Sequence, residues 1–168
     1  SLVEEPFVVP GSFDEAFLEL PDEVVISVMR DHQRYFAVRA PDGALLPSYL
    51  NVVNTAEDPG TIAKGNDRVL RARLADARFF VEEDLKAPLS DRLTKLDSVV
   101  FQSKLGTMGA KVRRLESNAN ALAEAVGVDA AASQAAARIC KADLETLIVY
   151  EFPELQGEMG RWYALREE

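Results

Sequence analysis

The sequence predicts an α+β fold that is mainly α, with a small N-terminal part of helices and strands followed by a helical region. Residues 34–39 and 45–53 are rich in aromatic and β-branched residues and flank the turn signal Pro41-Asp42-Gly43, which indicates a β-hairpin. From Thr61 onward, apolar residues recur at helical spacing. A chain of 168 residues that is 48% hydrophobic and 28% charged is typical of globular proteins and buries a core without disulfides or metals.

Two helices are predicted before the hairpin. Residues Ser12 to Glu15 read as a capping box, in which the Ser12 hydroxyl and the Glu15 carboxylate satisfy free backbone N–H groups. A short helix is therefore expected to run to Leu20. Pro21 suits the first turn of a second helix, which should end near His32. The apolar face of this second helix consists of residues at helical spacing: Val24, Val25, Val28 and Met29.

The hairpin needs support, because two strands alone are marginally stable in water. We expect it either to lean on the preceding helices or to join a sheet that residues outside this chain complete. The chain begins with Ser rather than Met and stops at the residues ALREE, without a turn or a helix cap. It is therefore interpreted as a piece of a longer protein, which fits the second possibility.

The remaining chain is predicted to be helical throughout. Residues 61–86 form one long helix, or two in series around Gly65, and Pro88 ends it. Further helices are expected over residues 89–96, 107–126, 130–139, 143–152 and 155–168, the second of them closed by Gly127. The turn-rich stretch 54–60 separates the two parts, so the expected division is residues 1–56 and 57–168.

Several classes of protein are excluded by what the sequence lacks. A single histidine, His32, rules out a site with several His ligands, and the lone Cys140 rules out an internal disulfide and indicates a reducing compartment. Neither a GxxxxGK[ST] loop nor a GxGxxG fingerprint is present. No apolar run approaches the roughly 18 residues of a membrane span, so no membrane partner is predicted.

Charge is distributed unevenly along the chain. The formal net charge is −9, which argues against nonspecific nucleic-acid binding over the whole surface. Residues 61–116 nevertheless hold 12 basic and 8 acidic groups, whereas residues 1–60 hold 3 basic and 11 acidic groups. The middle of the chain is thus the only basic part.

The basic residues of this middle part lie on predicted helices. Spacings of 3, 4 and 7 residues bring Lys64, Arg68, Arg71 and Arg78 to one side of a helix, where they could face a phosphate backbone. The alternative is a solvated helix face whose cations pair with Asp67, Asp76 and the acidic run at 82–84. Spacing alone favours this alternative.

Three other features have structural interpretations that are favoured over functional ones. His32 beside Asp31 is interpreted as a hydrogen-bonded structural residue. Core packing rather than base stacking is expected of four aromatic residues: Tyr150, Phe152, Trp162 and Tyr163. The glycine pairs in KLGTMGAK and ELQGEMGRWY lack the strand-to-helix context of a phosphate loop, so each is interpreted as close helix packing or a bend.

Five stretches of the sequence carry a family resemblance. In order they are FLELPDEVVISVMRDHQRYFAV, LLPSYLNVVN, GNDRVLRARLADARFFVEEDLK, VVFQSKLGTMGAKVRRLE and KADLETLIVYEFPELQGEMGRWYA. In that order and nearly without gaps, they resemble the β subunit of the bacterial heterotetrameric glycyl-tRNA synthetase. The resemblance covers about residues 13–166.

This resemblance implies a part of a cytoplasmic class II aminoacyl-tRNA synthetase that attaches glycine to its tRNA with ATP and Mg. In the family, the α subunit carries the adenylate-forming site and the β subunit binds and positions the tRNA. The chain is therefore expected to be noncatalytic, with neither a cofactor nor a metal of its own. Its expected partners are glycine tRNA, the α subunit and other domains of the β subunit.

The last of these stretches implies a further relationship. In the family, KADLETLIVYEFPELQGEMG lies at or near the start of a region similar to HD-type phosphohydrolases. Such chemistry needs several His and Asp ligands, and this chain has no histidine after residue 32. We therefore expect a degenerate HD-like region and no hydrolase activity.

Together, the charge segregation and the resemblance predict that this chain supports tRNA binding. The residues expected to contact tRNA are all basic and lie on the predicted helices: Lys64, Arg68, Arg71, Arg73, Arg78, Lys111, Arg113 and Arg114. The alternative is an assembly scaffold within the synthetase that does not contact tRNA. Exposed apolar surface around Phe79, Phe80 and Phe101, or burial of the arginines in ion pairs, would favour the scaffold.

Overall fold

The computed structural model describes residues 4–54 and 57–167, and the chain divides into two compact units. The first unit comprises residues 1–81 and the second residues 82–168. Each unit is described by itself below. Among the described residues, no helix is both long enough and apolar enough to cross a membrane.

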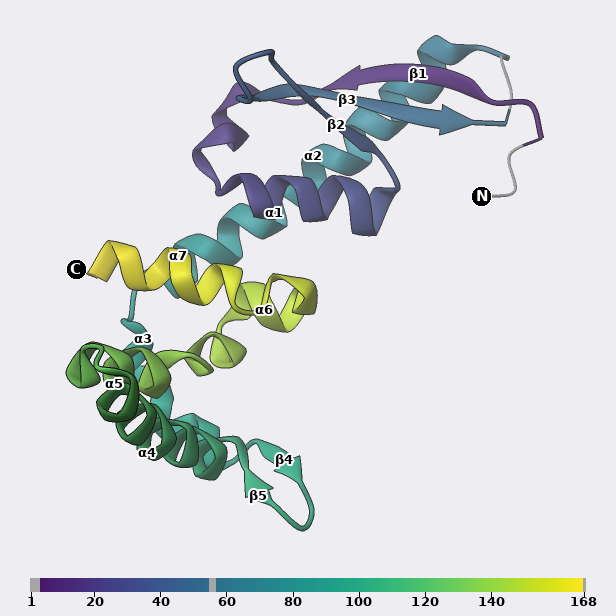
Figure 1. The fold of residues 1–168 in the computed structure, drawn as a ribbon. Helices are drawn as coiled ribbons and strands as arrows, with labels where there is room; N and C mark the ends of the chain where they lie inside the picture. Colours follow the sequence, from purple (N-terminus) through teal and green to yellow (C-terminus); the bar gives the residue numbers. More distant parts are fainter. Residues whose placement is uncertain (1–3, 55–56, 168) are drawn as a thin grey trace. The chain divides into compact units, whose positions relative to one another are not determined.

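The first unit is a small antiparallel sheet with helices (Figure 1). Its elements follow one another in the order β1 (Phe7–Ser12), the 3₁₀ helix η1 (Glu15–Glu19), α1 (Asp22–Ser27), the π-helical turn η2 (Val28–His32), β2 (Phe36–Arg39), β3 (Leu45–Val53) and the first part of α2 (Pro59–Asp84). The strand order is β1-β3-β2, so β3 is central and pairs antiparallel with both neighbours.

The predicted hairpin is confirmed as β2 and β3, with Gly43 in the turn at a φ of 91°. The sequence did not predict what completes the sheet around this hairpin. The third strand, β1, comes from this chain rather than from residues outside it. β1 pairs with β3 from Phe7 opposite Val53 to Ser12 opposite Ser48. Pro10 hid this strand in the sequence, since proline donates no ladder hydrogen bond, but an edge strand tolerates it.

The start of the first helical segment differs from the prediction. Ser12 ends β1, and the residue that caps η1 is Asp14, whose Oδ1 accepts a hydrogen bond from the Ala16 amide at 2.9 Å. Asp and Ser are equally good caps, so the choice followed from Ser12 being held in the sheet. The next helix is confirmed as α1 continued by η2, and its predicted apolar face is fully buried.

A polar contact joins α2 to the sheet within the first unit. The Tyr49 hydroxyl donates to Asp67 Oδ1 at 2.6 Å, and the Ser12 amide donates to the same oxygen at 3.1 Å. The Tyr49 ring stacks on Tyr35 with 4.5 Å between centroids. Burial and the adjacent Asp67 carboxylate raise the pKa of Tyr49, so its hydroxyl stays a donor.

The apolar side of the same helix completes the core of the first unit. Leu70, Leu74 and Ala77 are fully buried. Because this part of α2 belongs with the sheet, the first unit extends to Val81. The division expected from the turn-rich stretch at 54–60 therefore differs from the one in the structure.

The second unit is helical except for one small hairpin (Figure 1). After the end of α2 its elements are α3 (Leu89–Arg92), η3 (Leu93–Asp97), β4 (Val100–Gln102), β5 (Gly106–Thr107), α4 (Met108–Val126), α5 (Ala130–Ile139), η4 (Ala142–Glu145), α6 (Leu147–Glu151), η5 (Pro153–Leu155) and α7 (Glu158–Glu167). The structure thus confirms the predicted α+β, mainly α class.

Most helix boundaries agree with the predictions. Helix α2 runs unbroken through Gly65, and α5 covers the predicted residues 130–139, capped by Asp129. Helix α4 ends at Gly127, whose φ of 74° is the left-handed conformation that glycine adopts readily.

Three details of the second unit differ from the prediction. The hairpin of β4 and β5 was not predicted, because strands this short carry little sequence signal. The helix expected over 143–152 is interrupted at Thr146, which has extended backbone and caps α6. The last helix starts at Glu158 rather than at 155, because Gly157 turns the chain with a φ of 90°.

The two glycine pairs share one arrangement, which confirms their structural interpretation. The first glycine of each pair, Gly106 or Gly157, has a left-handed backbone and makes a bend. The second lies against a carboxylate. A Cβ on Gly109 would lie 2.2 Å from Asp97 Oδ1. A Cβ on Gly160 would lie 3.0 Å from an oxygen of Asp143.

The aromatic residues near the C-terminus divide into two groups. Phe152 and Tyr163 are buried, as predicted for core packing. Trp162 is half-buried, and its ring lies 3.7 Å from the Arg166 guanidinium. The prediction was wrong for Tyr150, which is 83% exposed. The break at Thr146 shifts the phase of α6 and turns Tyr150 outward.

Substitution of Gly11 tests the packing of β1 on β3. In Gly11→Ala the new Cβ would lie 2.2 Å from the ring of buried Tyr49, so we expect a loss of about 1–3 kcal/mol in unfolding free energy. The matched control is Gly65→Ala on α2, where no atom lies within 4 Å and the helix should gain about 0.5–1 kcal/mol. Both are measured by urea denaturation. Equal stability of Gly11→Ala and the parent would contradict this packing.

Candidate functional site

A row of exposed cations follows one side of α2 in the first unit. Lys64, Arg68 and Arg71 are all exposed, and their spacings of four and three residues place them on one helix face. In the part of the chain that the structure describes, none of the three forms an ion pair. We call these three residues the α2 basic face.

The acidic residue at pairing distance along the helix from two of these cations, Asp67, is engaged elsewhere. Asp67 accepts hydrogen bonds from Tyr49 and Ser12. Further along the helix, Glu83 pairs with Lys86, and Asp84 is buried. The charges of the α2 basic face therefore remain available to an anion.

The two other predicted arginines of α2 are placed differently. Arg73 is half-buried and has a partner of its own, and it lies about half a turn from Arg71 around the helix. Arg78 is half-buried, and its guanidinium carbon lies 4.3 Å from the centroid of the Phe17 ring. Such stacking is a cation–π contact, which reduces the exposure of Arg78 to an incoming phosphate.

The predicted cations of the second unit are not gathered on one face. Lys111 is half-buried with its ammonium 3.7 Å from the Phe101 ring centroid. Arg113 forms an ion pair with Asp97 at 2.9 Å. Arg114 is exposed, and no ion pair of it is found among the described residues. The three side chains thus have different surroundings: one lies on an aromatic ring, one is in an ion pair and one is exposed.

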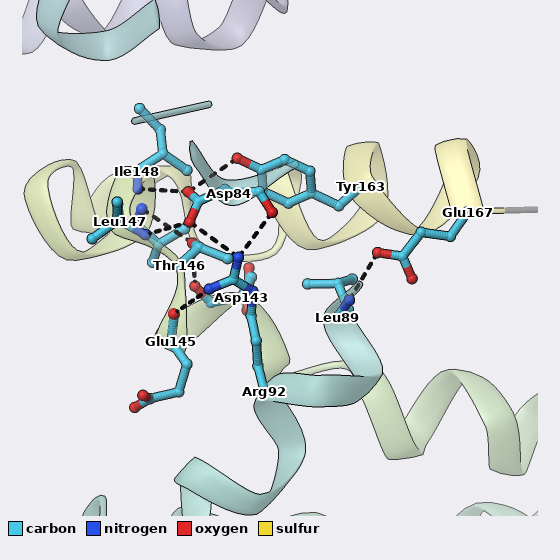
Figure 2. A network of polar contacts seen from close by, with 11 residues as sticks. Asp84, Leu89, Arg92, Asp143, Glu145, Thr146, Leu147, Ile148, Tyr163 and Glu167 are labelled. Atoms are coloured by element: carbon cyan, nitrogen blue, oxygen red, sulfur yellow. Dashed lines mark hydrogen bonds and ion pairs between the residues drawn. The ribbon is translucent and has the colours of Figure 1, made fainter. Parts of the chain in front are cut away.

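A buried polar network lies in the second unit, and the sequence did not reveal it (Figure 2). At its centre is Asp84, the last residue of α2, which is 3% exposed. Its Oδ1 accepts from the Leu147 amide at 2.8 Å, and its Oδ2 accepts from the Ile148 amide at 3.0 Å and the Tyr163 hydroxyl at 3.2 Å. One carboxylate thereby caps the N-terminus of α6 and holds α7.

Arg92 supplies the countercharge of this carboxylate. Its Nη2 lies 3.3 Å from Asp84 Oδ1 and donates to the Asp84 carbonyl at 2.9 Å. Its Nη1 donates to the Glu145 carbonyl at 2.9 Å. A buried ion pair is stable when its remaining donors and acceptors are satisfied, as most of them are here.

Asp143 holds the residues that precede α6 and α7. Its carbonyl accepts from the Thr146 hydroxyl at 2.6 Å, and its Oδ2 accepts from the Gly157 amide at 2.5 Å. The side chain is fully buried, and its Oδ1 has no hydrogen-bond partner among the residues that the structure describes. Close by in Figure 2, Glu167 accepts from the Leu89 amide at 2.8 Å, which ties the end of α7 to α3.

The chemistry of this network is structural. Burial and the Asp84 charge raise the pKa of Tyr163, so the hydroxyl stays protonated and donates to Asp84. Among the described residues, no group of three or more His, Cys, Asp or Glu side chains is placed to hold a metal ion. The acidic run at 82–84 looked like a solvated face in the sequence. Within this run the structural role belongs to Asp84, and its contacts with the distant residues Arg92, Leu147 and Tyr163 reveal it.

Comparison with known proteins shows the family. A family model described as glycyl-tRNA synthetase beta subunit matches residues 1–168. Among similar curated proteins is the glycine–tRNA ligase beta subunit of Desulforudis audaxviator, 53% identical over 98% of this chain and 25% of that protein. Those of Neisseria meningitidis serogroup C and Geotalea uraniireducens are 50% and 52% identical over 98% and 97% of this chain.

This chain belongs to the glycyl-tRNA synthetase β subunit family. It spans about a quarter of the length of the curated relatives it matches, 24–25% in the three cases above. The resemblance noted in the sequence is thereby confirmed.

Substitution of Asp84 tests the buried network. Asp84→Asn keeps the shape but leaves Arg92 without its countercharge, so we expect a loss of about 3–5 kcal/mol in the unfolding free energy of the second unit. Tyr163→Phe removes one hydrogen bond and should lose only about 1 kcal/mol. The control is Asp91→Asn at an exposed position, expected to be within about 0.5 kcal/mol of the parent. Denaturant unfolding measures all three, and an Asp84→Asn protein as stable as the control would refute the network's role.

Proposed function

We propose that this chain is a noncatalytic, tRNA-binding part of a glycine–tRNA ligase β subunit. The α2 basic face carries the proposal. Its three cations are exposed and form no ion pair with any residue that the structure describes, in a unit whose first sixty residues are strongly acidic. In this proposal the chain holds glycine tRNA while the α subunit of a cytoplasmic class II synthetase forms glycyl-adenylate with ATP and Mg. Other domains of the β subunit are its remaining partners.

The physical basis of tRNA binding is local charge. Cations that neutralise phosphates release condensed counterions, and this release drives binding without reading sequence. The α2 basic face extends over two turns of a regular helix, about 10 Å, so its side chains can follow one stretch of backbone. The acidic residues elsewhere in the first unit repel a polyanion, which favours contact at exposed cations such as this face and orients the RNA toward them.

The other predicted contacts are proposed in a secondary role. Arg114 is exposed and available, whereas the contacts of Arg73, Arg78, Lys111 and Arg113 would have to be shared or exchanged for phosphate. Exchanging an existing contact for a new one yields less net affinity than filling an unpaired charge. The strongest loss of tRNA affinity is therefore expected at Arg68 and Arg71.

A second candidate function, an assembly scaffold, is favoured by exposed apolar side chains. Phe79 on α2 is 54% exposed. At the end of α4, Leu122 and Val126 are 65% and 70% exposed at a spacing of four residues, and Val128 follows them beyond Gly127. Such a strip is suited to cover by another domain or by the α subunit.

Neutralising the α2 basic face tests tRNA binding. In the synthetase assembled from α and complete β subunits, Arg68→Ala/Arg71→Ala should weaken tRNA affinity and reduce the slope of log K against log salt by about 0.7–0.9 per lost phosphate contact. Glycyl-adenylate formation should be unchanged. Filter binding across a salt series and pyrophosphate exchange measure the two quantities.

The control for this test removes the same charge elsewhere. Lys86→Ala/Lys95→Ala takes two cations from the second unit, including the one already paired with Glu83, and should leave the salt slope as it was. Equal losses of adenylate formation and tRNA affinity in the Arg68/Arg71 variant would contradict the proposal.

The scaffold alternative makes a different prediction. If the strip at the end of α4 is covered in the synthetase, Leu122→Ser/Val126→Ser should weaken association with the α subunit, or domain packing within β, by a few kcal/mol and leave tRNA affinity per assembled enzyme intact. Sedimentation velocity of mixed subunits measures assembly. Normal assembly by this variant would speak against the scaffold at this surface.

A further inference from the structure

A surface hollow of about 320 Å³ lies in the first unit, where the π-helical turn η2 leads into β2. Six residues line it: Ile26, Arg30, Arg34, Tyr35, Phe36 and Ala37. None of them belongs to the α2 basic face. The volume is at the lower end of the range found for small-ligand sites.

The hollow is lined by two of the few basic residues in an acidic stretch of the chain. Residues 1–60 contain three basic groups, and two of them, Arg30 and Arg34, line the hollow, whereas the third, Arg39, pairs with Asp22 at 2.8 Å. Arg30 forms an ion pair with Asp31 at 2.8 Å, which lowers the pKa of that carboxyl and keeps it charged. Arg30 is thereby neutralised.

Arg34 supplies the uncompensated charge. It is exposed, and although its charge also acts on Asp31, no hydrogen bond or ion pair of its side chain is found in the described ranges. The rim of the hollow therefore carries about one net positive charge at Arg34.

The backbone at Arg34 is strained in a way that glycine would relieve. Its φ is 62°, the left-handed region, and it closes the helical turn by donating its amide to the Arg30 carbonyl at 3.2 Å. The Tyr35 amide donates to the Met29 carbonyl at 2.8 Å in the same closure. Glycine is the usual residue at such a position, and π turns are frequent at functional sites. A strained backbone at a non-glycine residue is a feature that clusters at binding sites, and here it fixes the position of the Arg34 side chain at the rim of the hollow.

An aromatic platform adjoins this charge. Phe36 is 61% exposed on the edge strand β2, although a phenylalanine ring is ordinarily buried. The neighbouring Tyr35 is 6% exposed and stacks on Tyr49, so the strand beneath the exposed ring is held firmly by the core. Phe36 is thus presented on a rigid support.

We propose that this hollow binds an unpaired nucleotide of an RNA, with the base against the Phe36 ring and the adjacent phosphate at Arg34. Exposed aromatic rings and arginine guanidinium groups are the side chains on which splayed bases stack and to which single-stranded backbones bind. A stacked duplex presents no free base face, so the hollow selects single-stranded RNA. The inference rests on the proposed function, since it adds a contact to a unit that holds tRNA.

The decisive variant is Arg34→Gly, because it removes the cation while relieving the backbone strain. We expect a melting temperature of the 168-residue chain that is unchanged or higher, together with affinity for a fluorescein-labelled ten-nucleotide single-stranded RNA that falls at least about fivefold. Phe36→Ala should lower the same affinity by a similar factor. The matched control is Phe79→Ala, which removes a ring of comparable exposure outside the hollow and should leave the affinity unchanged.

Several outcomes would overturn the inference. They are a parent chain that does not bind the single-stranded RNA, an affinity that Arg34→Gly and Phe36→Ala both leave unchanged, and equal losses for a duplex RNA of the same length. A loss of α-subunit association without a loss of RNA affinity would assign the hollow to a protein partner instead. Arg68→Ala/Arg71→Ala tests the α2 basic face separately, so failure of one site is distinguishable from failure of the other.

Discussion

The carboxylate of Asp84 is the constraint on which the second unit depends. It is buried at the end of α2, and its two oxygens accept from the first two amides of α6 and from the hydroxyl of Tyr163 on α7. A buried charge with so many donors is tolerated because Arg92 lies beside it. Helices separated by more than sixty residues in sequence therefore share one anchor (Figure 2).

A second carboxylate of α2, Asp67 in the first half of the helix, also accepts hydrogen bonds from distant parts of the chain. Asp67 accepts from Tyr49 and Ser12 in the first unit, much as Asp84 accepts from α6 and α7 in the second. Because the Asp67 carboxylate serves packing, it is withdrawn from Lys64 and Arg71, which lie three and four residues away on the same helix. Lys64, Arg68 and Arg71 thereby remain exposed and unpaired within the described residues, and the proposed tRNA contact follows from this division of labour.

The agreement between sequence and structure depends on the range of the interaction concerned. Helices α2, α4 and α5 were predictable, since apolar spacing and the caps Gly127 and Asp129 are local signals. Strand β1 was not, because its pairing with β3 joins residues about forty positions apart and Pro10 masks it. The candidate site was predictable as a basic stretch but not as a face. Only the structure shows that Arg71 is exposed whereas Arg78 is half-buried with its guanidinium over the Phe17 ring.

By itself, the sequence determined the family, the mainly helical class, most helices and the segregation of charge. These properties reside in residue identity and short-range periodicity, which are present before the chain folds. Only the tertiary structure decided which charges are free, which are buried, and where an arginine is held in a left-handed turn beside an exposed ring. The reason is physical. The state of a charged side chain depends on partners that packing brings from distant parts of the chain, and a linear pattern does not contain those distances.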